Sequence, residues 1–191
     1  MTSAKLFTER MRRGVPCEIK RSTVSETVAV RGYASTFGGI DAYGDTVEPG
    51  AYAVTLAKHR KERTRPVMLW QHDPSEPIGV WDRLEEDGKG LFVEGRLLTS
   101  VRRGAEAAAL IEVGGVAGLS IGYRIERQKQ IGNVRHLIEI DLIEVSVVSF
   151  PADQDARIDP SKQHDARAFL RAMLSEYRDD DARVFLRALL R

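Results

Sequence analysis

The sequence predicts an α+β domain built on a bent or closed, barrel-like antiparallel sheet with a few helices, followed by a helical C-terminal tail. Two observations carry this prediction. Many short segments alternate apolar and polar residues and are separated by turn-forming residues, and only a couple of helical patterns lie among them. Short strands joined by hairpin turns are typical of a strongly curved sheet decorated by helices.

The strand and helix patterns of the first half follow one another closely. Alternation predicts a strand over residues 27–34, which ends in a Gly- and Asp-rich loop over residues 38–45. A helical pattern covers residues 51–61, and a short apolar strand over residues 66–71 delivers His72 at its end. The strands over residues 78–84 and 91–98 flank an Asp-Gly pair, which is a strong hairpin signal.

The second half begins with an Ala-rich helix over residues 105–113, which Gly114 and Gly115 end. Extended runs follow over residues 116–127, 134–140 and 141–150, and Pro151 stops the last one. Beyond residue 160, the segment 165–174 is repeated as 181–190 with similar apolar stripes. Each copy predicts a short amphipathic helix, and these helices either pack on the domain, pair with each other or dock onto a partner protein.

Length and composition limit the number of domains and the kinds of partner. The 191 residues are 42% hydrophobic and 30% charged, which suits one core but hardly two. We expect a basic arm over residues 1–21, one domain over 22–159 and the tail over 160–191. The net charge of +1 supplies no field for nucleic acid or an anionic membrane, and no apolar run is long enough to span a bilayer. The lone Cys17 cannot form an internal disulfide, which fits the cytosol.

Ser120 is the candidate nucleophile. It is the centre of Gly-Leu-Ser-Ile-Gly over residues 118–122, where alternation turns Gly118, Ser120 and Gly122 to one face and the apolar side chains to the other. The hydroxyl is then expected to point outward between two glycines, which leaves space for an extended backbone to approach it. A serine packed between glycines in a tight sheet fits this segment equally well. The elbow of α/β-hydrolases does not, because strand-like residues follow the serine.

A serine hydroxyl needs a base that takes its proton, and histidine suits that task near neutral pH. His72 follows directly on an apolar strand, a position from which a rigid scaffold presents functional groups. His59, His136 and His164 lie in charged or polar surroundings that explain them as surface residues. We therefore expect His72 to be the general base.

Glu144 is the candidate third group, which would orient the imidazole of His72. It interrupts an apolar run over residues 142–148, where a carboxylate is costly unless it is paired or functional. Asp73 and Asp141 are its rivals, and the donors of an oxyanion hole cannot be placed from the sequence.

A set of short motifs resembles one protein family. In order they cover residues 31–37, 41–45, 49–52, 70–73, 77–79, 90–95, 118–123 and 144–152. Their order and spacing are similar to those of the procapsid maturation proteases of HK97-type tailed phages, which are related to the herpesvirus assembly proteases. The resemblance implies a herpesvirus-protease-like fold over the domain and a catalytic pair formed by Ser120 and His72.

The resemblance also implies peptide-bond hydrolysis with no cofactor and no metal. Its expected substrates are the major capsid protein or a scaffold protein, and the protease itself by autoproteolysis. The expected place of action is the interior of the procapsid in the bacterial host cytoplasm, with neither nucleic acid nor membrane as partner, and a homo-oligomer is left open. A non-catalytic capsid-assembly or scaffolding protein with the same fold is the main alternative, and an esterase using the same residues is a weaker one.

Overall fold

The computed structural model describes residues 27–159, so the predicted arm and tail, with Cys17 and His164, lie outside the described residues. Seven strands and two helices follow one another along this part of the chain. They are β1 (Thr27–Thr36), β2 (Asp45–Val47), α2 (Ala53–Glu62), β3 (Val67–Trp70), β4 (Asp73–Glu86), β5 (Gly90–Leu98), α3 (Arg102–Glu112), β6 (Gly118–Ile131) and β7 (Val134–Val148).

All seven strands belong to one sheet in the order β1-β5-β4-β3-β7-β2, and β6 pairs with β7. The β1–β5, β4–β5, β3–β4 and β6–β7 pairs are antiparallel, including the predicted hairpin of β4 and β5. The sequence analysis expected an antiparallel sheet, but the sheet is mixed, because β2 and β3 run parallel to β7. Parallel neighbours need a long connection, and several elements separate β2 and β3 from β7 along the chain.

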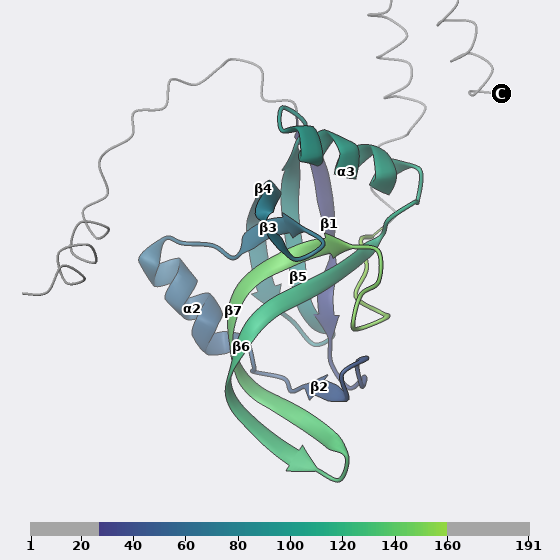
Figure 1. Ribbon diagram of the computed structural model, residues 1–191. Coiled ribbons are helices and arrows are strands. Elements are labelled where there is room, and N and C mark those ends of the chain that lie inside the picture. Colours follow the sequence, from purple (N-terminus) through teal and green to yellow (C-terminus); the bar gives the residue numbers. More distant parts are fainter. Residues whose placement is uncertain (1–26, 160–191) are drawn as a thin grey trace, which may run out of the picture.

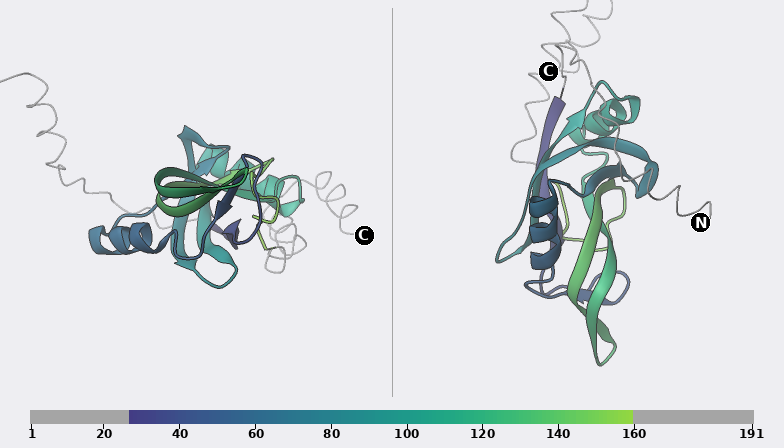
Figure 2. Two further views of the ribbon diagram at one scale, coloured as in Figure 1. Left: turned by 90° about the horizontal axis from the view of Figure 1, so that it is seen from below. Right: turned by 90° about the vertical axis from the view of Figure 1, so that its left-hand side faces the viewer.

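The sheet curls until its two edge strands are joined through a short segment after β7. Gly32 of β1 bridges to Ile158, and Gly118 of β6 bridges to Arg157. The Leu119 amide also donates to the Ala156 carbonyl over 2.9 Å. The predicted α+β class with a bent, barrel-like sheet is therefore confirmed, and Figures 1 and 2 show the curl from three directions.

Large apolar side chains from most strands fill the inside of the curled sheet. Trp81 is fully buried, and its indole Nε1 donates to the Val145 carbonyl over 3.2 Å, which ties β4 to β7. Burial of one such large side chain contributes about 1.5–3 kcal/mol. The helix α3 lies at one end of the sheet, whereas the tip of the β6–β7 hairpin projects at the other end (Figure 1). Neither described helix is long and apolar enough to cross a membrane.

Several strand boundaries differ from the sequence expectation. β4 begins at Asp73 and not near residue 78, β6 extends to Ile131 and not only to residue 127, and β2 was not expected as a strand. Residues 134–140 and 141–150 were expected as two successive runs, but β7 is continuous from Val134 to Val148. Asp141 lies within this continuous strand opposite Arg124 of β6, and its carboxylate accepts a hydrogen bond from Lys58 of α2 over 3.2 Å.

Candidate active site

His72 lies in a tight turn where β3 passes into β4. Gln71 and His72 both have left-handed backbone angles, with φ of 53° and 61°. Such a conformation costs a non-glycine residue about 1–3 kcal/mol and persists where the surroundings hold it. The Gln71 side chain donates from Nε2 to Ser149 Oγ over 2.8 Å, and its Oε1 accepts from the Ser149 amide over 3.2 Å. The residue directly after β7 therefore anchors this strained turn.

The His72 imidazole is paired with Glu144. Its Nδ1 lies 2.5 Å from Glu144 Oε1, the geometry of a strong hydrogen bond to a carboxylate. The Glu144 side chain is 9% exposed, whereas that of His72 is 43% exposed. With Nδ1 directed to the carboxylate, Nε2 is the ring nitrogen left to exchange a proton, since no described residue hydrogen-bonds it.

Ser146 connects the two members of this pair. Its hydroxyl donates to Glu144 Oε2 over 2.6 Å and accepts from the His72 amide over 3.1 Å. Ser146 is fully buried and lies two residues after Glu144 on β7, so both side chains are on the same face of the strand.

Ser120 lies on β6 directly opposite Ser146 in the antiparallel ladder. Directly opposed side chains share a face of the sheet, with Cβ atoms about 4.5–5.5 Å apart. The neighbouring Leu119 is fully buried on the core face, as the alternation predicts. Ser120 as a whole is only 7% exposed, so its neighbours cover most of the residue. In the described part of the chain this hydroxyl makes no hydrogen bond, and catalytic contacts often tighten only when substrate binds.

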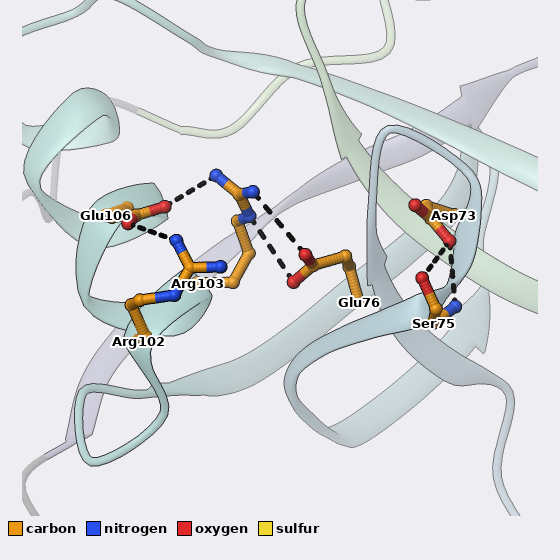
Figure 3. Close-up of polar contacts among 6 residues, drawn as sticks. All are labelled: Asp73, Ser75, Glu76, Arg102, Arg103 and Glu106. Carbon is orange, nitrogen blue, oxygen red and sulfur yellow. Dashed lines mark hydrogen bonds and ion pairs between the residues drawn. The ribbon is translucent and has the colours of Figure 1, made fainter.

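The two rival carboxylates are engaged elsewhere. Asp73 Oδ1 accepts from both the amide and the hydroxyl of Ser75 (Figure 3), and these hydrogen bonds hold the pKa of Asp73 below its usual value. Asp141 lies beside Thr55 and Lys58 of α2. Among the three candidates, Glu144 is the one that the structure brings to His72.

A group of ion pairs attaches the strand that follows His72 to helix α3. Arg103 of α3 contacts both Glu76 of β4 and Glu106 one turn along its own helix, and Arg102 also reaches Glu106 (Figure 3). These groups are at least partly exposed, so solvent screens each pair and its contribution to stability is small. They link β4 to α3 close to the turn that carries His72.

The other described histidines have structural partners. His59 lies within hydrogen-bond distance of Thr64 Oγ1 and of the Leu142 carbonyl, and His136 lies 2.5 Å from Glu48. No group of at least three metal-ligating side chains occurs among residues 27–159.

Ser146, Gln71 and Ser149 are members of this site that the sequence analysis did not single out. The signal for Ser146 was present in the alternation, which places it on the face of Glu144 while Val145 and Val147 face the core. No comparable pattern marks Gln71 or Ser149, since their contact depends on the path of the turn.

Comparisons with known proteins agree with this fold and show the family of the chain. The family model of the caudovirus prohead serine protease matches residues 16–169. The prohead protease of Enterobacteria phage HK97 is 34% identical over 168 residues, covering 85% of this chain and 72% of the phage protein. The prohead protease of Escherichia phage T5 is 29% identical over 139 residues, covering 71% and 63% of the two chains.

Two solved structures share the fold at low sequence identity. The bacteriophage T4 capsid assembly protease superposes with a TM-score of 0.57 at 12% identity, over 70% of this chain and 88% of the other. The KSHV protease bound to a hexapeptide phosphonate inhibitor gives a TM-score of 0.50 at 14% identity, over 84% and 75%. The extent of the family match decides the assignment. The chain belongs to the caudovirus prohead serine protease family and is a peptidase of phage capsid maturation.

Proposed function

We propose that the chain is a serine endopeptidase in which Ser120 is the nucleophile, His72 the general base and Glu144 the group that orients His72. The observation that carries the proposal is the contact of His72 Nδ1 with the buried Glu144 carboxylate, one strand away from Ser120. A carboxylate that holds Nδ1 fixes the tautomer in which Nε2 accepts a proton.

The reaction follows from these roles. Ser120 Oγ attacks the carbonyl carbon of the scissile peptide while His72 Nε2 takes the hydroxyl proton. The imidazolium, stabilised by Glu144, returns that proton to the leaving amine as the C–N bond breaks, and an acyl-enzyme on Ser120 remains. Water then attacks the ester by the same route, with His72 again as the base, and free Ser120 is restored.

The proposed substrates are the capsid or scaffold protein of the same phage, together with the protease chain itself. Two curated relatives are named prohead proteases, and a structural neighbour is named a capsid assembly protease. We place the activity inside the procapsid within the bacterial host cytoplasm.

Co-expression with the phage's capsid protein tests this function. The wild-type chain is expected to yield defined capsid-protein fragments in mass spectrometry, whereas Ser120→Ala yields none. A fluorophosphonate probe, which reacts with activated serines, should label the wild-type chain and leave Ser120→Ala unlabelled. Equal fragment patterns from both chains would refute the assignment of Ser120 and favour a non-catalytic assembly protein or a contaminating protease.

A further inference from the structure

Ser146 touches both halves of the His72–Glu144 pair through one oxygen atom. The His72 amide can only donate, so Ser146 Oγ is the acceptor of that 3.1 Å hydrogen bond. The single proton of the hydroxyl is then left for Glu144 Oε2, 2.6 Å away. Glu144 thereby accepts at both oxygens, from Ser146 and from His72, as an ionised carboxylate does.

The surroundings of Ser146 argue against a role in packing alone. The residue is fully buried between the apolar neighbours Val145 and Val147. A hydroxyl at such a position is unfavourable unless it is hydrogen-bonded, and an apolar side chain would fill the space without that requirement. Both hydrogen bonds that satisfy the hydroxyl go to the His72–Glu144 pair.

The backbone conformation of His72 gives this contact a function. His72 has a left-handed backbone that needs external support, and its own amide is the group that Ser146 binds. Ser146 also lies directly opposite Ser120 across the β6–β7 ladder. One side chain thus fixes the main chain and the carboxylate partner of His72 beside the strand that carries Ser120.

We infer that Ser146 is a positioning residue for proteolysis, whose hydroxyl holds the Glu144 carboxylate and the His72 main chain in one arrangement so that the imidazole stays aligned with Ser120. The inference rests on the proposed function, because it assigns Ser146 a part in the same site. Ser146 has no bond to form or break in the reaction.

The test compares Ser146→Ala, Ser146→Cys and Ser146→Thr in the full chain. The measured quantity is the rate constant of fluorophosphonate labelling, with the final labelled fraction reported separately. Ser146→Ala should label about 100-fold more slowly, the effect expected when reacting groups are displaced by about 1 Å. Ser146→Cys keeps the shape of the side chain but supplies only a weak hydrogen-bonding group and should also be slow, whereas Ser146→Thr keeps the hydroxyl and should recover most of the rate.

A spectroscopic readout separates positioning from general destabilisation. The Nδ1 proton shared by His72 and Glu144 should give a far-downfield NMR signal in ¹⁵N-histidine-labelled protein. The signal should shift or broaden in Ser146→Ala. The matched control is Ser35→Ala, which removes a buried hydroxyl from β1 and should change neither the signal nor the rate.

If the wild-type chain is labelled, and Ser146→Ala has the same labelling rate and the same NMR signal as the wild-type chain, the inference is overturned while the proposed function stays intact. If Ser146→Ala does not fold, the other two variants decide, and equal rates for Ser146→Cys and Ser146→Thr would overturn it. A wild-type chain that never labels would instead count against the proposed function itself.

Discussion

Gly122 of β6 lies directly opposite Glu144 of β7, and the Glu144 carboxylate occupies the space in which a side chain at Gly122 would lie. A Cβ atom at Gly122 would lie 2.8 Å from Cγ and Cδ of Glu144 and would overlap Oε1. The second glycine of the Gly-Leu-Ser-Ile-Gly motif is therefore linked to His72 through the carboxylate that it accommodates.

Gly122→Ala should accordingly lower activity although it replaces none of the three proposed catalytic-site residues. Displacing the Glu144 carboxylate by about 1 Å misaligns His72, and we expect a loss of about 100-fold in the fluorophosphonate labelling rate. Gly88→Ala is the matched control, since nothing lies within 4 Å of a Cβ at Gly88. A Gly122→Ala chain that folds and labels as fast as Gly88→Ala would contradict the link.

Ser120→Ala and His72→Ala should each abolish cleavage of the capsid protein. Groups that act as one unit give non-additive losses, so we expect each single change to cost about 10⁶-fold and the double change hardly more. Ser120→Ala should leave the fold intact, because the hydroxyl makes no hydrogen bond within residues 27–159. Circular dichroism and thermal melts check folding. Losses that multiply in the double variant would show that the two residues do not share one mechanism.

Glu144→Gln should reduce cleavage far more than either rival carboxylate change. Replacing the carboxylate by an amide permits the wrong imidazole tautomer, which costs about 10⁴-fold in a comparable triad. Asp73→Asn and Asp141→Asn should stay near the wild-type rate, because their contacts are with Ser75 and with helix α2. The measurement is the initial rate of capsid-protein cleavage for all three. A crippling Asp73→Asn change would assign the third role to Asp73 instead.

Local patterns were sufficient to predict much of this fold. The β4–β5 hairpin was predicted from its Asp-Gly turn, and the ends of α2 and α3 fall within a few residues of the expected ones. The parallel pairing of β3 with β7 was not predictable in the same way. It joins segments about 77 residues apart, as in Val67 and Glu144, and no local pattern encodes which distant strand becomes a neighbour.

The same limit applies to the candidate site: local patterns could single out polar residues, but not the contacts that the fold gives them. Ser120, His72 and Glu144 could be singled out from the sequence as candidates because each is a polar group next to apolar or glycine residues. The hydrogen bonds of Ser146 and Gln71 depend on a turn in which both Gln71 and His72 are left-handed, a conformation that is uncommon for residues other than glycine. The burial of Ser120 was missed for a related reason, since alternation assigns a face of a strand and gives no information on what covers that face.

Tyr52 makes the fold sensitive to alkaline pH. Its side chain is fully buried, and burial raises the pKa of the hydroxyl above the ordinary value of about 10. Because the folded state then keeps a proton that the unfolded chain releases, this contribution to stability is complete below about pH 10 and is lost as the pH rises further. The loss should reach at most about 1.4 kcal/mol per pH unit for this one group.

Tyr52→Phe should therefore flatten the fall in unfolding free energy above pH 10. Urea denaturation followed by circular dichroism at several pH values from 8 to 11 measures it, and the difference between variant and wild type is the informative quantity. Tyr43→Phe is the control, since Tyr43 is 78% exposed and its removal should leave the slope unchanged. Tyr123, whose pKa burial and the nearby Asp45 also raise, should keep part of the alkaline slope in Tyr52→Phe. Identical slopes for wild type and Tyr52→Phe would show that ionisation of Tyr52 is not coupled to folding.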